Sequence, residues 1–253
     1  MDTDQIVIER EDELAIVTMN DPDRRNALGS AGARAVADSI AEAARGARVV
    51  ILTGVGPAFC AGGDLDELER WSSQPLDVIG ETLYGSFQTM IRTIRNSDAV
   101  VIAAVNGAAV GAGMDLALAC DLRVASESAR FGQVWVRLGV IPGTGGAWLT
   151  TFLAGPTRAA ELLLTGDLVS AEDALGAGLV NSVAPDGELM VAARRLAGRI
   201  MRHPRDGVVA NKRAYVAATA DRLEAALAHA AEVQPHRFTS DEFKAALRGA
   251  RKR

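Results

Sequence analysis

The sequence predicts an α/β fold in which a strand, loop and helix unit occurs twice and a helical region follows. Two apolar stretches, within 48–54 and 99–107, are rich in Val and Ile, as buried strands are. Each runs into a loop of small residues and then into a helical pattern. The last fifty residues are rich in Ala and Arg and contain few strand formers, which predicts a separate layer of helices.

The N-terminal region predicts a β-hairpin and then a helix. Residues 5–10, "QIVIER", and residues 14–19, "LAIVTM", read as short strands separated by the charged turn "EDE". A helix is expected over 30–45 because alanines and spaced apolar positions follow Ser30, a residue type that caps helices well. Ser30 is therefore the expected N-cap.

The rest of the chain predicts alternating elements that give way to helices. From residue 143 onward the pattern is mainly helical, punctuated by Gly or Pro near 155, 166, 178 and 204. The elements expected before that point are, in chain order, a strand at 48–54, a long amphipathic helix at 76–95, a strand at 99–107, a helix from near Gly113 to about Cys120, and a strand at 121–126.

The chain resembles itself at an offset of 51 residues. Residues 49–65, "VVILTGVGPAFCAGGDL", and 100–116, "VVIAAVNGAAVGAGMDL", are identical at nine of 17 positions. The identity extends through the loop to an Asp-Leu pair, at Asp64 and at Asp115. Such a repeat indicates a stacked supersecondary unit. The alternative is a chance likeness between apolar strands and Gly-Ala loops.

Each copy of the repeat places a helix N-terminus behind a loop of small residues. A helix N-terminus carries unpaired N–H donors and a positive partial charge. Two such ends facing each other would stabilise an oxygen that gains negative charge, by about 2.7–4 kcal/mol per donor. Small side chains let a ligand approach the main chain. Ordinary tight strand-to-helix packing is the alternative interpretation.

Composition and charge exclude several classes of protein. A net charge of −5 and a pI of about 5.3 disfavour a nucleic-acid surface. No apolar run has the length of a membrane span, and the acidic start has no apolar segment typical of a signal peptide. Cys60 and Cys120 form no disulfide framework, which suits the cytoplasm. A solvated basic tail is expected from Arg248, Arg251, Lys252 and Arg253.

Motifs for other common chemistries are absent from the sequence. "GVGPAF" follows a strand, but Phe59 stands where a dinucleotide-binding loop needs its third glycine. There is no phosphate-binding G-x-x-x-x-G-K-[ST], no G-x-S-x-G and no H-E-x-x-H. His203, His229 and His236 lack metal-ligand spacing, so no metal site is expected.

Four segments together resemble the crotonase superfamily, the enoyl-CoA hydratase/isomerase family. They are "NDPDRRNAL", "PAFCAGGDL", "NGAAVGAGMDLALACDLRVAS" and "FGQVWVRLGVIPGTGGAWLTTFLAG", in the family's order. The resemblance covers essentially the whole chain. It implies a crotonase-like spiral of repeated ββα units over 1–195, which would hold the acyl site, and a helical oligomerisation region over 196–253. It also implies a homotrimer or a hexamer built as a dimer of trimers.

The resemblance implies a substrate and three catalytic groups. Family members bind an acyl-CoA thioester and stabilise its enolate with two backbone N–H groups, which fall here on Gly63 and Ala112. Asp115 falls where the hydratases carry the first of two catalytic glutamates, so an acid/base role is expected. The alternative is a carboxylate that complements the helix macrodipole. Coenzyme A enters as part of the substrate, and no bound cofactor is expected.

The resemblance also implies contacts for coenzyme A and for the acyl group. Arginine suits phosphate, and Arg24 or Arg25 is the candidate to meet it, the alternative being a solvated arginine. Asp64 is a second candidate contact for coenzyme A, and it is also expected to keep a structural role at its helix start. The other candidates are Ala27, Ala61 and Leu65 for coenzyme A, and Trp135 and Gly143 for the acyl pocket.

The chain departs from the hydratases at the second catalytic glutamate. Trp135 occupies that position, and an indole cannot act as a general acid or base. Some relatives carry an acid in the "IPG-x-G" turn instead, but here Thr144 stands there. Three possibilities stay open: a lyase or isomerase that uses Asp115 alone, a hydrolase or C–C-cleaving relative with another water activator, and a non-catalytic CoA-binding homologue.

Overall fold

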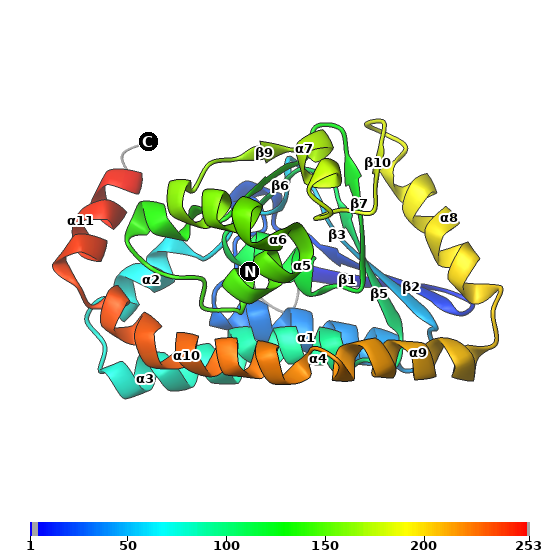
Figure 1. The fold of residues 1–253 in the computed structure, drawn as a ribbon, viewed down its shortest axis with the longest axis horizontal. Helices are drawn as coiled ribbons and strands as arrows, with labels where there is room; N and C mark the ends of the chain where they lie inside the picture. Colours follow the sequence, from blue (N-terminus) through cyan, green and yellow to red (C-terminus); the bar gives the residue numbers. More distant parts are fainter. Residues whose placement is uncertain (2–4, 252–253) are drawn as a thin grey trace.

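The computed structural model describes residue 1 and residues 5–251, and its strands form two sheets (Figure 1). The larger sheet has the order β1-β2-β3-β5-β7-β10, and the smaller one has the order β4-β6-β8-β9. The strands of the larger sheet are β1 Ile6–Glu11, β2 Leu14–Met19, β3 Val49–Gly54, β5 Val100–Val105, β7 Leu122–Ser126 and β10 Ser182–Ala184. Those of the smaller sheet are β4 Ala58–Cys60, β6 Ala108–Val110, β8 Arg130–Gly132 and β9 Val169–Ser170.

The expected N-terminal hairpin is confirmed. Strands β1 and β2 pair antiparallel, with Ile6 opposite Met19 and Glu11 opposite Leu14. Strand β2 then pairs in parallel with β3, so the hairpin forms one edge of the larger sheet. Only β2 of the two is largely buried, because β1 is the edge strand.

The internal repeat is a repeat of structure. Strands β3 and β5 pair in parallel with Val49 opposite Val100 and Ile51 opposite Ile102, so the register of the sheet equals the 51-residue offset in the sequence. Each copy then crosses to the smaller sheet, where β4 pairs with β6, and ends in a helix. Strands β7 and β8 add a further turn beside them. The predicted spiral of ββα units is therefore confirmed.

The two faces of the larger sheet bury alternate residues of the same strand. Val50 and Leu52 point into the main core, which also contains Val36 and Ile40 of α1 (Ser30–Ala44). Val49 and Ile51 point into a second cluster beneath α8 (Leu189–Met201). This period of two is what an all-buried strand requires when helices cover both faces.

The expected helix over 76–95 is present and contains a π-helical segment. It consists of α3 Leu76–Thr82, the π segment Leu83–Gln88 and α4 Thr89–Asn96. The prediction that Ser30 caps α1 was wrong. Gly29 is the N-cap, and the Ser30 N–H donates to Glu67 Oε2 at 2.9 Å. Glu67 lies in α2 (Leu65–Trp71), so a carboxylate from another helix supplies the acceptor that Ser30 was expected to provide.

The C-terminal part is mainly helical, as expected, although the short strands β9 and β10 were not predicted. Gly155 breaks the helical geometry inside α6. The expected boundary between residues 195 and 196 lies within α8, so the division of the chain into two parts stays a prediction. The helices are α6 Gly146–Thr165, α7 Ala171–Gly176, α8 Leu189–Met201, α9 Arg205–Ala217, α10 Ala220–Phe238 and α11 Asp241–Ala250.

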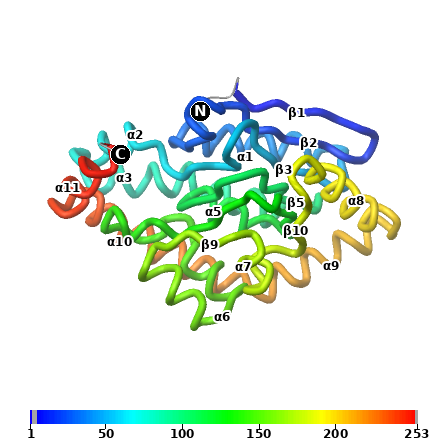
Figure 2. The backbone as a smooth tube through the Cα atoms, turned by 90° about the horizontal axis from the view of Figure 1, so that it is seen from above, coloured from blue at the N-terminus to red at the C-terminus, as the bar shows by residue number. Residues whose placement is uncertain are grey.

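The last helices return along the molecule to the N-terminal half. Figure 1 shows α10 running beside α4 and α3, and Figure 2 shows α11 beside α2, far from α8 and α9. Arg251 at the end of α11 forms ion pairs with Asp66 and Glu69 of α2, so this part of the tail is not simply solvated. Residues 2–4 of the acidic start, and Lys252 and Arg253, lie outside the described residues. Within the described part, no helix is long and apolar enough to cross a membrane.

Candidate active site

The two glycine-rich loops of the repeat lie directly against each other. A Cβ at Gly113 would lie 2.1 Å from the Cys60 carbonyl oxygen, and one at Gly62 would lie 2.9 Å from the Val110 carbonyl oxygen. Gly62 also has a φ of +101°, which L side chains rarely adopt. The loop after β4 and the loop after β6 can therefore approach this closely only because these positions carry no side chain.

The N–H groups of Gly63 and Ala112 have no acceptor among the described residues. The Leu28 N–H donates to the Gly62 carbonyl oxygen at 2.8 Å, and the Leu28 carbonyl oxygen accepts from the Asp64 N–H at 2.8 Å. Because alternate residues of an extended chain point in opposite directions, the Gly63 N–H between them points away from Leu28. Ala112 is the first residue of α5 (Ala112–Ala119), where an N–H has no intrahelical partner. Both candidate donors are consequently free.

The candidate coenzyme A contacts gather around the first loop. The Ala61 N–H donates to the Arg25 carbonyl at 3.0 Å, and the Ala27 N–H donates to the Arg24 carbonyl at 3.1 Å. Segment 24–28 therefore runs alongside loop 61–64. Leu65, which begins α2, packs with its half-buried side chain against the main core. The structure thus brings together the candidates that the sequence placed here.

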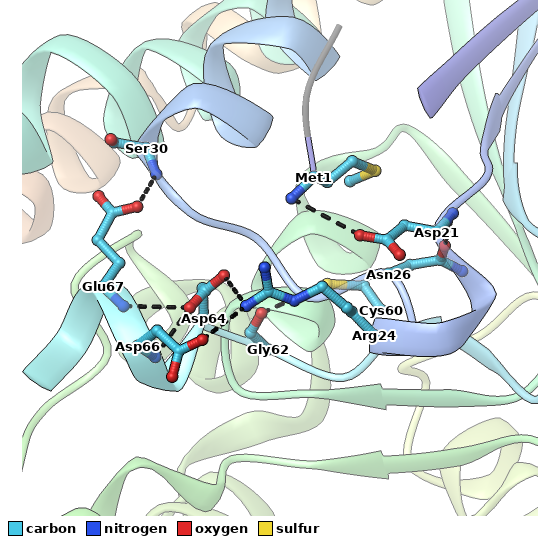
Figure 3. A network of polar contacts seen from close by, with 10 residues as sticks. All are labelled: Met1, Asp21, Arg24, Asn26, Ser30, Cys60, Gly62, Asp64, Asp66 and Glu67. Carbon is cyan, nitrogen blue, oxygen red and sulfur yellow. Dashed lines mark hydrogen bonds and ion pairs between the residues drawn. The ribbon is translucent and has the colours of Figure 1, made fainter. Parts of the chain in front are cut away.

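Arg24 and Asp64 form an ion pair beside this loop (Figure 3). The Arg24 guanidinium lies 2.5 Å from Asp64 Oδ2 and 3.2 Å from Asp66 Oδ2. Asp64 is also the N-cap of α2, because its other oxygen accepts from the N–H groups of Asp66 and Glu67. Arg24 is therefore paired although its side chain is 47% exposed, and Asp64 joins the Arg24 segment to the start of α2.

Asp115 is completely buried and its carboxylate accepts hydrogen bonds from two side chains. Gln133 Nε2 donates to Oδ1 at 2.9 Å, and the Thr144 hydroxyl donates to Oδ2. Gly146, the first residue of α6, lies against the same carboxylate, because a Cβ at Gly146 would lie only 1.8 Å from Asp115 Oδ1. Asp115 therefore lies at the start of α6, whereas its repeat counterpart Asp64 caps its own helix.

Burial raises the pKa of Asp115 from 3.8 to about 6. The hydrogen bonds from Thr144 and Gln133, and the nearby backbone N–H of Gly146, favour the ionised form and oppose this rise. The Trp135 indole N–H acts in the same direction from outside hydrogen-bond geometry. A carboxyl with a pKa near 6 can exchange a proton close to neutral pH, as a general acid or base must.

Trp135 lies on a short 3-10 helix, Val134–Leu138, beside the second loop. A Cβ at Gly111, which precedes Ala112, would lie 3.7 Å from the Trp135 ring. The ring is buried, and it lines an apolar groove of about 340 Å³ together with Gln133 and residues of α6 and α10. Gly143 lies elsewhere: its carbonyl accepts from Gln88 Nε2 at 3.2 Å, and it packs against Gln234.

Sequence reasoning missed the groups that surround Asp115. Gln133 was seen only as part of the "FGQ" segment, and Thr144 only as a position without an acid. The contacts of Gln133, Thr144 and Gly146 with Asp115 join residues 18, 29 and 31 positions apart in the chain. The only signal was that these residues fall in the same two segments that carry the family resemblance. Within the described residues, no cluster of three His, Cys, Asp or Glu side chains is placed to hold a metal ion.

Known proteins resemble this chain along its whole length. The family model for enoyl-CoA hydratase/isomerase matches residues 9–253. A short-chain-enoyl-CoA hydratase of Clostridium acetobutylicum is 34% identical over 98% of this chain and 94% of its own. A probable enoyl-CoA hydratase of Mycobacterium tuberculosis is 38% identical over 99% of this chain and 98% of its own. A 1,2-epoxyphenylacetyl-CoA isomerase of Escherichia coli is 34% identical over 83% and 81%.

Solved structures agree with these sequences. An enoyl-CoA hydratase/isomerase from Mycobacterium paratuberculosis superposes with a TM-score of 0.89 at 27% identity, over 97% of this chain and 98% of the other. The fold is thus that of the crotonase class. The chain belongs to the enoyl-CoA hydratase/isomerase family of enzymes.

Proposed function

We propose that this protein acts on an acyl-CoA thioester and stabilises the thioester enolate with the N–H groups of Gly63 and Ala112. The observation that carries the proposal is that both N–H groups are free and lie on loops in direct contact. Preorganised donors of this kind stabilise developing negative charge most strongly where water is excluded. Ala112 is fully buried, which favours such an environment.

Asp115 is the proposed acid/base group. It follows Ala112 by one helical turn on α5, so its carboxylate belongs to the same helix start as the second enolate donor. In its ionised form it would take a proton from the carbon that becomes part of the enolate, and in its protonated form it would return the proton. A pKa of about 6 makes both forms accessible near neutral pH.

A reaction that needs one carboxylate fits the site better than water addition by two. Trp135 stands at the second glutamate position and Thr144 donates to Asp115 instead of supplying an acid. We therefore favour a lyase or isomerase reaction with Asp115 as the single carboxylate. A hydrolase or C–C-cleaving relative would use the same enolate site with another water activator, and a non-catalytic CoA-binding homologue would use it for binding alone.

Coenzyme A is placed along the first loop in this proposal. The main chain at Ala27, Ala61, Asp64 and Leu65 would contact it, and Arg24 would turn from its two carboxylates towards a phosphate. Trp135 would line the acyl pocket, with Gly143 supporting the turn behind it.

Oligomeric state and location are also proposals. A homotrimer or hexamer would cover the exposed apolar side chains of α6, where Phe152 and Leu164 are 55% and 75% exposed. Both cysteines are buried free thiols, which suits the cytoplasm.

A screen of acyl-CoA thioesters tests the proposed function. Each thioester is assayed for turnover, with product identified by chromatography, and for protection against thermal unfolding. An isomerised or cleaved thioester supports the proposal, and free acid plus coenzyme A would favour the hydrolase. Protection without turnover would make the chain a binding protein, and neither protection nor turnover would refute an acyl-CoA site.

A further inference from the structure

Asn26 lies next to Ala27, a candidate coenzyme A contact, and its side chain is fully buried. Its Oδ1 accepts from the N–H of Asp21 at 2.9 Å, and the two residues lie together in Figure 3. Its Nδ2 donates to the carbonyl oxygens of Val55 at 3.0 Å and of Ala58 at 2.8 Å. Carbonyl oxygens only accept and a backbone N–H only donates, so these partners fix the orientation of the amide.

The local backbone is built around this amide. Arg25 and Asn26 have φ values of +52° and +56°, in the left-handed region, where asparagine is among the few side chains that are well tolerated. A Cβ at Gly54 would lie 2.6 Å from Asn26 Nδ2, so the amide fits only because residue 54 has no side chain. Backbone held in such sparsely populated regions is typical of functional sites.

The segment that Asn26 anchors also holds the first loop. The carbonyl of Arg25, one residue earlier, accepts from the N–H of Ala61 at 3.0 Å. Leu28, two residues later, pairs with the residues on both sides of Gly63, which sets the direction of the Gly63 N–H. The same short segment is thus fixed by the amide on one side and fixes the loop on the other.

We propose that Asn26 is a positioning residue for enolate stabilisation: its amide holds segment 25–28, and this segment directs the Gly63 N–H. The inference rests on the proposed function, in which that N–H meets the enolate oxygen. When the C2–H bond of the acyl group breaks, the proton goes to Asp115 and the electron pair moves onto the thioester oxygen, where negative charge develops. Without the amide, the Gly63 donor is no longer held towards this oxygen, and proton removal slows.

Asn106, in the second copy of the repeat, offers a matched control. Its Nδ2 donates to the carbonyl oxygens of Gly56 at 3.0 Å and of Ala58 at 3.2 Å, and its Oδ1 accepts from the N–H of Gly54 at 3.2 Å. It therefore clamps the same turn as Asn26 does. Among the described residues it has no hydrogen bond to segment 25–28, so its loss should lower stability without slowing enolate formation.

Exchange of the C2 protons of an acyl-CoA in heavy water tests the proposal, because it reports enolate formation whatever reaction follows. Exchange in the wild type is followed by NMR with acetyl-, butyryl- and octanoyl-CoA, and the fastest substrate is used at saturation for the variants. Asn26→Gly removes the amide and suits the left-handed backbone. Its exchange should be slower by roughly 10–100-fold, less than the roughly 10²–10³-fold that loss of a whole donor costs. Asn106→Ala should exchange at nearly the wild-type rate, although both variants should melt at lower temperatures.

Asn26→Asp is the second variant. Its carboxylate keeps an oxygen for the N–H of Asp21 but, when ionised, cannot donate to the carbonyls of Val55 and Ala58, so it should show the same slow exchange. Wild-type exchange in both Asn26 variants, or an equal loss in Asn106→Ala, overturns the positioning role and leaves the acyl-CoA function intact. Absence of exchange in the wild type with all three thioesters overturns the proposed function itself.

Discussion

The carboxylate of Asp115, a residue of α5, lies against Gly146 at the N-terminus of α6, where a Cβ would come within 1.8 Å of Asp115 Oδ1. This contact places a negative charge at the positive end of α6, which stabilises both the carboxylate and the helix. It also joins the second loop of the repeat to the "IPGTGG" turn. The proposed acid/base group is thus also a structural link between two helices.

Gly146→Ala should disrupt this link. The added Cβ would lie 1.8 Å from Asp115 Oδ1, so the carboxylate or α6 must move. We expect a loss of about 1–3 kcal/mol in unfolding free energy, as for overpacked cores, and lower turnover. Gly198→Ala in α8 is the control, because a Cβ there meets nothing within 4 Å, and it should be neutral or slightly stabilising. Equal thermal stability of the two variants would contradict the close contact.

Asp115→Asn should remove proton transfer while keeping the size of the side chain. We expect turnover to fall by roughly 10²–10⁴-fold, with little change in acyl-CoA affinity. In the wild type, kcat should rise with pH through about 6 as the carboxyl ionises, and the variant should lose this dependence. Normal turnover in Asp115→Asn would leave Asp115 only a structural role in the contact between α5 and α6.

The same carboxyl should make stability depend on pH. Because folding raises the pKa of Asp115 from 3.8 to about 6, the folded state holds the proton more tightly than the unfolded state. The stability from this group is present below pH 4 and is lost as pH rises through 6, by about 3 kcal/mol. The unfolding free energy of the wild type and that of Asp115→Asn are measured from pH 4 to 7.5. The difference, wild type minus variant, should decline by about 3 kcal/mol over this range. A flat difference would show that the carboxyl titrates normally.

Ala112→Pro should abolish turnover by deleting one proposed enolate donor. Ala112 is the first residue of α5, and this is the helix position that tolerates proline, so folding should largely survive. Ala112→Gly keeps the N–H and serves as the control, with turnover within a few-fold of wild type expected. Steady-state kinetics, acyl-CoA binding and thermal unfolding are compared for both. If Ala112→Pro turns over normally, its N–H has no part in the mechanism.

Because Trp135 stands at the position of the second hydratase glutamate, we expect this protein to be a weak hydratase. The wild type should hydrate crotonyl-CoA slowly or not at all, because no second carboxylate is present. Trp135→Glu would restore one, yet it removes a buried ring at a cost of about 3–5 kcal/mol, and a buried Glu tends to stay protonated. We expect at most a weak gain in hydration and a lower melting temperature. Rapid wild-type hydration would mean that Asp115 alone suffices for water addition.

Much of the fold followed from local and repeated patterns in the sequence. Strands β3 and β5 were visible as Val- and Ile-rich stretches. The repeat indicated that they are equivalent strands of stacked units, and in the sheet they pair with Val49 opposite Val100. The strands β9 and β10 escaped detection because two or three residues carry too little periodicity to report a strand.

The sequence by itself determined the repeated strand, loop and helix unit, the two glycine-rich loops and the position of Asp115 behind the second loop, and the family resemblance added the ββα spiral. Only the tertiary structure decided what those residues touch. Glu67 replaces Ser30 at the start of α1, and Gln133, Thr144 and Gly146 converge on Asp115. Periodicity and capping patterns report interactions within a few residues of chain, whereas these hydrogen bonds join segments that meet only when the spiral closes. The burial that raises the pKa of Asp115 arises from the same closure, so it too belongs to the folded state.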